Sequence, residues 1–187
     1  MRASARRTST TVVAVVGDAD AARACVERLG HAVNVTWLVA DPDDDPLDRA
    51  VTAWADAARS HSPYFVHDAD PLAAVADAWV RRFDEAGPHG ELEVALAETL
   101  ARWRPGSIEL PDYYLALDAE SWGATRRHWF LGVLHAAAPG RVVPTLAADA
   151  DTALAHLASA RWWPDLDELL AGIDRVVPDQ VRAGPTA

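Results

Sequence analysis

The chain has 187 residues, of which 50% are hydrophobic and 24% are charged. This length allows one sizeable hydrophobic core but falls short of two ordinary domains. Its 17 basic and 28 acidic residues give a formal net charge of −11, which argues against binding to nucleic acid or to an anionic membrane. Every basic residue is an arginine, which excludes lysine-dependent chemistry such as a pyridoxal phosphate Schiff base or a phosphate-loop lysine.

Cysteine content and hydropathy indicate the cellular compartment in which we expect the protein. The single cysteine, Cys25, allows no internal disulfide, so we expect a reducing, cytoplasmic environment. The apolar run after the basic amino terminus is too short for an export signal, and no 18 apolar residues are consecutive. We predict one domain over residues 10–178, with flexible tails at 1–9 and 179–187.

The first half of the chain alternates strands with helices. A β-branched apolar run predicts a strand at 11–16, and apolar residues at helical spacing predict a helix at 20–29. The same pattern then repeats, with a strand at 33–40 and a helix at 47–58. A short strand at 63–67 is followed by two helices without a strand between them, at 72–83 and 91–104.

The second half continues the alternation. We predict a strand at 113–118, a helix at 121–137, and a strand at 141–146 that Pro144 places at the edge of a sheet. Two short helices follow, at 151–161 and 165–173. The alternation predicts a three-layer Rossmann-like or flavodoxin-like α/β domain, with about five mostly parallel strands and helices on both faces. The strand order stays open.

Acidic doublets follow each predicted strand, where parallel strands end at one edge of the sheet. They begin at Asp18, Asp41, Asp68, Asp118 and Asp149. Carboxylate oxygens are the ligands that Mg²⁺ or Mn²⁺ prefers, so one hypothesis is a metal site for hydrolysis or phosphoryl transfer. Its ligands would be Asp18, Asp20, Asp68, Asp70 and Asp118. The alternative is that these residues cap helices and complement helix dipoles.

Three of these acidic stretches resemble short motifs of known families. VHDADP is similar to the metal-binding Asp-x-Asp of nucleotide-sugar glycosyltransferases, and VVGDADAAR with LVADPDDDP is similar to the acidic motifs of TOPRIM nucleases. Asp18 and Asp20 are placed like the Asp-x-Asp of haloacid-dehalogenase-like phosphatases. Gly17 replaces the TOPRIM glutamate, and the lysine of the phosphatases is missing. Each similarity covers about ten residues or fewer, and we assign the chain to none of these families.

Residues 119–123 lie between a predicted strand and a helix and read Ala-Glu-Ser-Trp-Gly. They resemble the nucleophile elbow of the α/β-hydrolases, with alanine in place of the first glycine. The resemblance implies a serine hydrolase with Ser121 as nucleophile, completed by His156 and by Asp149 or Asp151. The alternative is that Ser121 caps the following helix.

His67 is the histidine at the predicted ligand edge, next to Asp68, and is a second catalytic candidate. The alternative is a packed or solvated side chain. Arg126 falls in the middle of the apolar face of helix 121–137, where a guanidinium needs a partner. We expect Asp118, Asp68 or Asp18 to supply it. Arg126 is then an anion-binding residue in a cleft, half of a structural ion pair, or an arginine that extends along a tryptophan to the surface.

The phosphate-binding motifs of common cofactors are missing. The turn after the first strand has one glycine where a dinucleotide fingerprint has three, and its carboxylates would face the pyrophosphate, which argues against NAD or FAD. Our leading hypothesis is a domain that binds a small molecule or a protein partner at the carboxyl edge of the sheet. A homodimer formed through a helix bearing Trp and Phe is one version of it. The alternatives are the Mg²⁺- or Mn²⁺-dependent hydrolase or phosphotransferase and, third, the serine hydrolase.

Overall fold

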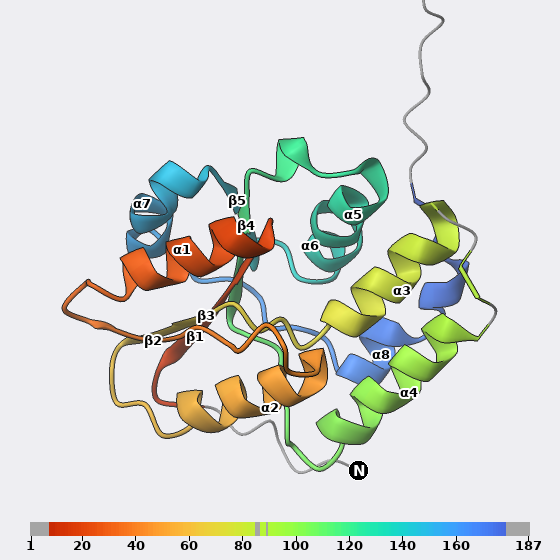
Figure 1. Ribbon diagram of the computed structural model, residues 1–187, viewed down its shortest axis with the longest axis horizontal. Coiled ribbons are helices and arrows are strands. Elements are labelled where there is room, and N and C mark those ends of the chain that lie inside the picture. Colours follow the sequence, from red (N-terminus) through yellow and green to blue (C-terminus); the bar gives the residue numbers. More distant parts are fainter. Residues whose placement is uncertain (1–7, 85–86, 89, 179–187) are drawn as a thin grey trace, which may run out of the picture.

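The computed structural model describes residues 8–84, 87–88 and 90–178. Of the predicted tails at 1–9 and 179–187, all but Thr8 and Ser9 lie outside the described residues. The described part forms a five-stranded parallel sheet between two layers of helices (Figure 1), which confirms the predicted three-layer α/β class.

Every strand pair in the sheet is parallel. The strands are β1 (Thr11–Val16), β2 (Val35–Leu38), β3 (Tyr64–His67), β4 (Tyr113–Leu117) and β5 (Val142–Thr145). Their order is β2-β3-β1-β4-β5, so β5 is an edge strand and the prediction from Pro144 is confirmed. This order differs by the exchange of two strands from both the 3-2-1-4-5 order of Rossmann folds and the 2-1-3-4-5 order of flavodoxin-like folds.

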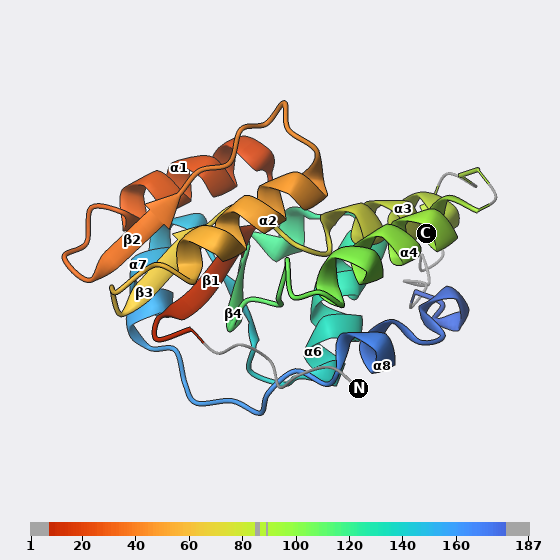
Figure 2. The same ribbon diagram turned by 90° about the horizontal axis from the view of Figure 1, so that it is seen from below.

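Helices cover both faces of the sheet, and we name the faces by their helices. The first face carries α1 (Ala19–Leu29) and α7 (Ala150–Ala155), which contact each other. The second face carries α2 (Pro46–Ala57), α3 (Ala73–Asp84), α4 (Glu91–Trp103), α5 (Ala124–His128), α6 (His135–Ala137) and α8 (Leu166–Leu170). Figures 1 and 2 both show α3 and α4 lying side by side on this second face.

The alternation of side chains along β1 explains why two layers form. Val13 and Val15 pack toward α1 on the first face, whereas Ala14 and Val16 belong to the larger core on the second face. All four are at most 5% exposed. A strand buried on both sides therefore needs a continuous apolar run, which is what the sequence of β1 has.

The predicted helix 121–137 is interrupted. The chain leaves β4 through a 3-10 turn, η1 (Ala119–Ser121), and an extended Trp122, so α5 begins only after Gly123. A π-helix, η2 (Trp129–Leu134), then separates α5 from α6. A wheel drawn at 3.6 residues per turn therefore misplaces side chains along this segment.

The two predicted carboxyl-terminal helices are shorter than expected, because tertiary hydrogen bonds hold the chain between them. Arg141, 3% exposed, donates to the carbonyl oxygens of Ala160 (2.9 Å) and Arg161 (2.6 Å). The Tyr113 hydroxyl donates to the Ala158 carbonyl oxygen (2.8 Å). Two further 3-10 turns, η3 (Ala147–Asp149) and η4 (Ile173–Arg175), complete the elements. No helix within the described residues is long and apolar enough to cross a membrane.

Candidate functional site

The acidic doublets do lie along one edge, because all five strands are parallel, but most of them act on the backbone. Asp18 caps α1, with its Oδ1 accepting a hydrogen bond from the Ala21 amide (3.1 Å). Asp20 is exposed in the first turn of the same helix, where a carboxylate complements the helix dipole.

Asp68 and Asp118 connect neighbouring strand ends. Asp68 Oδ1, after β3, accepts from the Ala40 amide after β2 (2.8 Å). Asp118 Oδ1, after β4, accepts from the Ala147 amide after β5 (3.3 Å). Each inner strand thus holds the loop of its outer neighbour. Asp118 also has a positive φ of 48°, an uncommon conformation for a residue other than glycine.

Four of the five carboxylates proposed as metal ligands accept a hydrogen bond from a backbone amide, and the fifth, Asp20, is exposed. Among the residues that the structure describes, which include all five, no group of three or more His, Cys, Asp or Glu side chains is placed to hold a metal ion. The structure thus does not assemble the predicted set Asp18, Asp20, Asp68, Asp70 and Asp118 into one site.

Asp70 differs from the other edge carboxylates because it is buried, with 8% exposure. Its Oδ1 accepts from the Leu72 amide (2.9 Å) and from the Tyr114 hydroxyl (2.8 Å). Burial raises the pKa of Asp70 to about 6, although both hydrogen bonds and the charge of Arg126 oppose the rise. Burial and the adjacent Asp70 also raise the pKa of Tyr114 well above 10.

His67 is buried as well, like Asp70 and Tyr114. The strand register places Ala14 between His67 on β3 and Tyr114 on β4, and the small alanine leaves room for the larger side chains beside it. Burial lowers the pKa of His67 to about 4, and its Nδ1 accepts from the Ala69 amide (3.3 Å). The imidazole is therefore neutral at physiological pH and is a weaker base than general-base catalysis near neutrality requires.

Arg126 pairs with a residue that we did not predict. Its Nη1 lies 3.3 Å from Asp77 Oδ1 on α3, not beside Asp118, Asp68 or Asp18. The 3-10 turn and extended residue before α5 carry Arg126 away from the strand ends and toward α3. The side chains of Arg126 and Asp77 are 41% and 45% exposed, and the Arg126 guanidinium carbon lies 6.0 Å from the centroid of the Trp122 ring.

Ser121 does not cap α5, and its catalytic role stays a prediction. Its Oγ donates to the Asp118 carbonyl oxygen (2.8 Å) at the end of η1, and the residue that caps α5 is Gly123. His156 Nδ1 lies 2.8 Å from the Thr152 carbonyl oxygen within its own segment. Ser121 and His156 thus engage the backbone of their own turns and are not hydrogen-bonded to each other. The residue with positive φ near this turn is Asp118, not Ser121.

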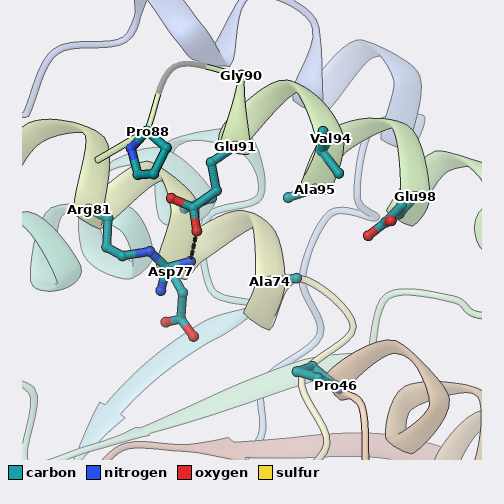
Figure 3. Close-up of a pocket in the computed structure, with 11 residues that line it drawn as sticks. Pro46, Ala74, Asp77, Arg81, Pro88, Gly90, Glu91, Val94, Ala95 and Glu98 are labelled. Carbon is teal, nitrogen blue, oxygen red and sulfur yellow. Dashed lines mark hydrogen bonds and ion pairs between the residues drawn. The ribbon is translucent and has the colours of Figure 1, made fainter. Parts of the chain in front are cut away.

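A groove of about 670 Å³ runs between α3 and α4 on the second face (Figure 3). It begins at the carboxyl edge of the sheet, where Pro46 opens α2 and Ala74 lies in the first turn of α3. Its apolar lining consists of Pro46, Ala74, Ala78, Pro88, Val94 and Ala95. Its charged lining consists of Asp77, Arg81, Glu91 and Glu98. This volume lies within the range of small-molecule sites.

The charged side chains that line the groove differ in whether they have an ion-pair partner. Arg81 Nη2 and Glu91 Oε1 form an ion pair near the hairpin between the helices. Asp77 pairs with Arg126, which is not a lining residue. Glu98 is exposed and forms no ion pair within the described part of the chain. The lining therefore presents more negative than positive charge at neutral pH.

We did not predict this groove, although the spacing of its lining residues can be recognised in the sequence. Each helix contributes lining residues at i, i+3, i+4 and i+7, which share one helix face. They are Ala74, Asp77, Ala78 and Arg81 on α3, and Glu91, Val94, Ala95 and Glu98 on α4. The prediction followed the large apolar residues of both helices. The neighbouring stripe of alanines and charges was the missed signal, because small side chains on adjacent helices leave space between them.

Comparisons of this chain with models of protein families, with curated proteins and with solved structures find no match.

Proposed function

We propose that the protein is a small-molecule-binding domain whose ligand occupies the α3–α4 groove beside the carboxyl edge of the sheet. The observation that carries this proposal is the groove itself, with about 670 Å³ of space lined by alanine, valine and proline around a few charged groups. Such a composition lets an apolar ligand body displace water while polar groups orient it. The buried free thiol of Cys25 supports action in a reducing compartment, and we propose the cytoplasm.

The partner-binding version of the hypothesis receives less support. Trp129 and Phe130, on the helix that we expected to form a homodimer, are fully buried in the second-face core. Trp162 is 49% exposed, but its ring lies over the Arg141 guanidinium at 4.2 Å. The groove lining includes none of these tryptophan and phenylalanine side chains, so a small molecule can bind there without displacing them.

A screen of small molecules against the isotope-labelled full chain tests the proposal. The library holds neutral, cationic and anionic compounds, and amide shifts in α3 and α4 report binding. We expect hits whose shifts gather around the groove and disappear in Ala74→Phe, because Ala74 is partly exposed and a phenyl ring there fills the space. The matched control is Ala97→Phe, an exposed position of α4 outside the lining, which should keep binding.

Two results would contradict the proposal. One is a library in which no compound shifts the groove amides. The other is hits that bind Ala74→Phe and Ala97→Phe equally well, which would place binding elsewhere. A milder filling variant, Ala74→Val, serves if the phenylalanine disturbs folding.

A further inference from the structure

We infer that the ligand of the groove is a linear aliphatic polyamine, of which a diamine is the smallest member. This inference rests on the proposed function and adds the chemical class of the ligand. It is argued from the apolar floor, from the two acidic positions along it, and from the charge around its open end.

The middle of the groove favours an alkyl chain. Ala74, Ala78 and Ala95 carry no polar side-chain atoms and are all short, so they form an apolar floor between the helices. Figure 3 shows Val94 and Ala95 between Glu91 at one end of the α4 row and Glu98 at the other. The side chains of Val94 and Ala95 offer no hydrogen-bond partner, so the part of a ligand that lies over them is best matched by apolar groups.

Two carboxylates are placed for ammonium groups. Glu98 has no ion pair among the described residues. Asp77 pairs only with Arg126 in this part of the chain, and both side chains are more than 40% exposed. Exposed ion pairs contribute little stability, so Asp77 can accept a ligand ammonium at small cost. The helix spacing places Asp77 and Glu98 on opposite helices, along the same groove.

The surroundings of the groove favour a cation as well. The exposed loop Asp41-Pro42-Asp43-Asp44-Asp45 runs directly into Pro46, which lines the groove. The ion pair between Asp48 and Arg102 (3.0 Å) lies where the first turn of α2 meets the carboxyl end of α4, so this acidic loop lies near the Glu98 end. Its field attracts cations and repels anions, in line with the net charge of −11. Arg81 does not offset this attraction, because Glu91 neutralises it.

Titrations of the labelled full chain with five probes, all at the same ionic strength, test the inference. The probes are 1,5-diaminopentane, spermidine, pentylamine, 1,5-pentanediol and glutarate. We expect the groove amides to respond to the amines, with the diamine binding about fivefold more tightly than pentylamine, because a second exposed charge contact contributes up to about that factor. Spermidine should bind at least as tightly as the diamine.

Matched variants assign the effect to the groove. Glu98→Gln should weaken diamine binding about fivefold, to the level of pentylamine, while leaving pentylamine within about twofold. Glu27→Gln removes the same charge from an exposed position of α1 on the first face and should leave both affinities unchanged. Equal losses in the two variants would reduce the effect to net charge and overturn the inference.

The outcomes separate this inference from the proposed function. Tighter groove binding of the diol or of glutarate than of the diamine overturns the polyamine class, but leaves a small-molecule site in place. Absence of groove shifts with all five probes and with the wider library overturns both.

Discussion

The two faces of the sheet differ in what they bury. The first face is closed by α1 and α7 over valines of β1 and over Tyr113, Leu115 and Leu117 of β4, together with Cys25, whose thiol pKa is raised by burial. The second face buries Trp79, Trp129 and Phe130 beside the ionisable side chains of Asp70, His67 and Tyr114. It also holds a π-helix and the groove. Buried ionisable groups and an irregular helix lower the stability of a fold, and both occur on the second face. Such features are typical of functional sites, so we expect function on this face.

Removal of a large aromatic from the second face should give the largest effect. Trp79 is fully buried against Trp129 and Phe83, and its Nε1 donates to the Ile173 carbonyl oxygen (3.2 Å). Trp79→Ala should lower the free energy of unfolding by about 3–5 kcal/mol in urea titrations. Hydrogen exchange should accelerate most in η4, because its contact with α3 is lost.

Leu115→Ala is the matched change on the first face, since Leu115 is also fully buried. It should cost about 2–5 kcal/mol without a selective acceleration in η4. Identical exchange patterns in the two variants would show that the faces do not respond separately.

The stability of the fold should also depend on pH, because folding raises the pKa of Asp70 and lowers the pKa of His67. The folded-state pKa of Asp70, about 6, lies above its ordinary 3.8, so acidification from pH 7 to pH 4 stabilises the fold through this group. The folded-state pKa of His67, about 4, lies below its ordinary 6.5, so the same acidification destabilises the fold. Each contribution is about 2–3 kcal/mol, and in the native protein the two oppose each other.

Single variants should remove this opposition. Between pH 7 and pH 4, Asp70→Asn should lose about 2–3 kcal/mol relative to the native protein, because its stabilising proton uptake is gone. His67→Asn should gain a similar amount over the same range. Urea titrations at five pH values measure both. Parallel pH profiles for the native protein and the two variants would contradict the assigned pKa directions.

The sequence predicted the framework of this molecule well for a physical reason. Buried parallel strands require apolar runs, and helices that cover them require apolar stripes, so β1 and α4 were found nearly to the residue. The strand order could not be predicted, because it depends on which sheet positions the crossovers reach. The interrupted segment after β4 could not be predicted either, because it depends on tertiary contacts of Trp129 and Phe130.

The site was predicted less well. The shared acidic edge followed from parallel strands, but the role of each carboxylate depends on which backbone amide it meets, as Asp68 meets Ala40. Asp70 differs from Asp68 through its burial and through the hydrogen bond that it accepts from Tyr114, a distant residue that no local pattern records. The groove was missed because it is formed by small side chains, whose spacing resembles ordinary alanine content.

A smaller effect distinguishes structural from chemical roles at the edge carboxylates. Asp118 has φ 48° and ψ 39°, and its Oδ1 accepts from the Ala147 amide. Asp118→Ala should cost about 1–2 kcal/mol, since alanine loses the hydrogen bond and tolerates this backbone poorly. Asp118→Asn should stay within about 0.5 kcal/mol, because asparagine keeps an acceptor and adopts this conformation readily. Urea titrations of the two variants test the order, and a larger loss for asparagine than for alanine would contradict a structural role.

The smallest effect should come from the ion pair at the border between the groove and the buried cluster. Arg126→Gln removes an exposed partner of Asp77, so the free energy of unfolding should change by less than about 1 kcal/mol. The charge of Arg126 also lowers the pKa of Asp70, so the same variant should raise that pKa above its native value of about 6. Carbon-detected titration of the Asp70 carboxyl measures this shift, with Arg127→Gln, whose partner is Glu120, as the matched control. An unchanged titration of Asp70 in Arg126→Gln would mean that the groove and the buried cluster are electrostatically separate, and that the second face holds two independent features instead of one connected site.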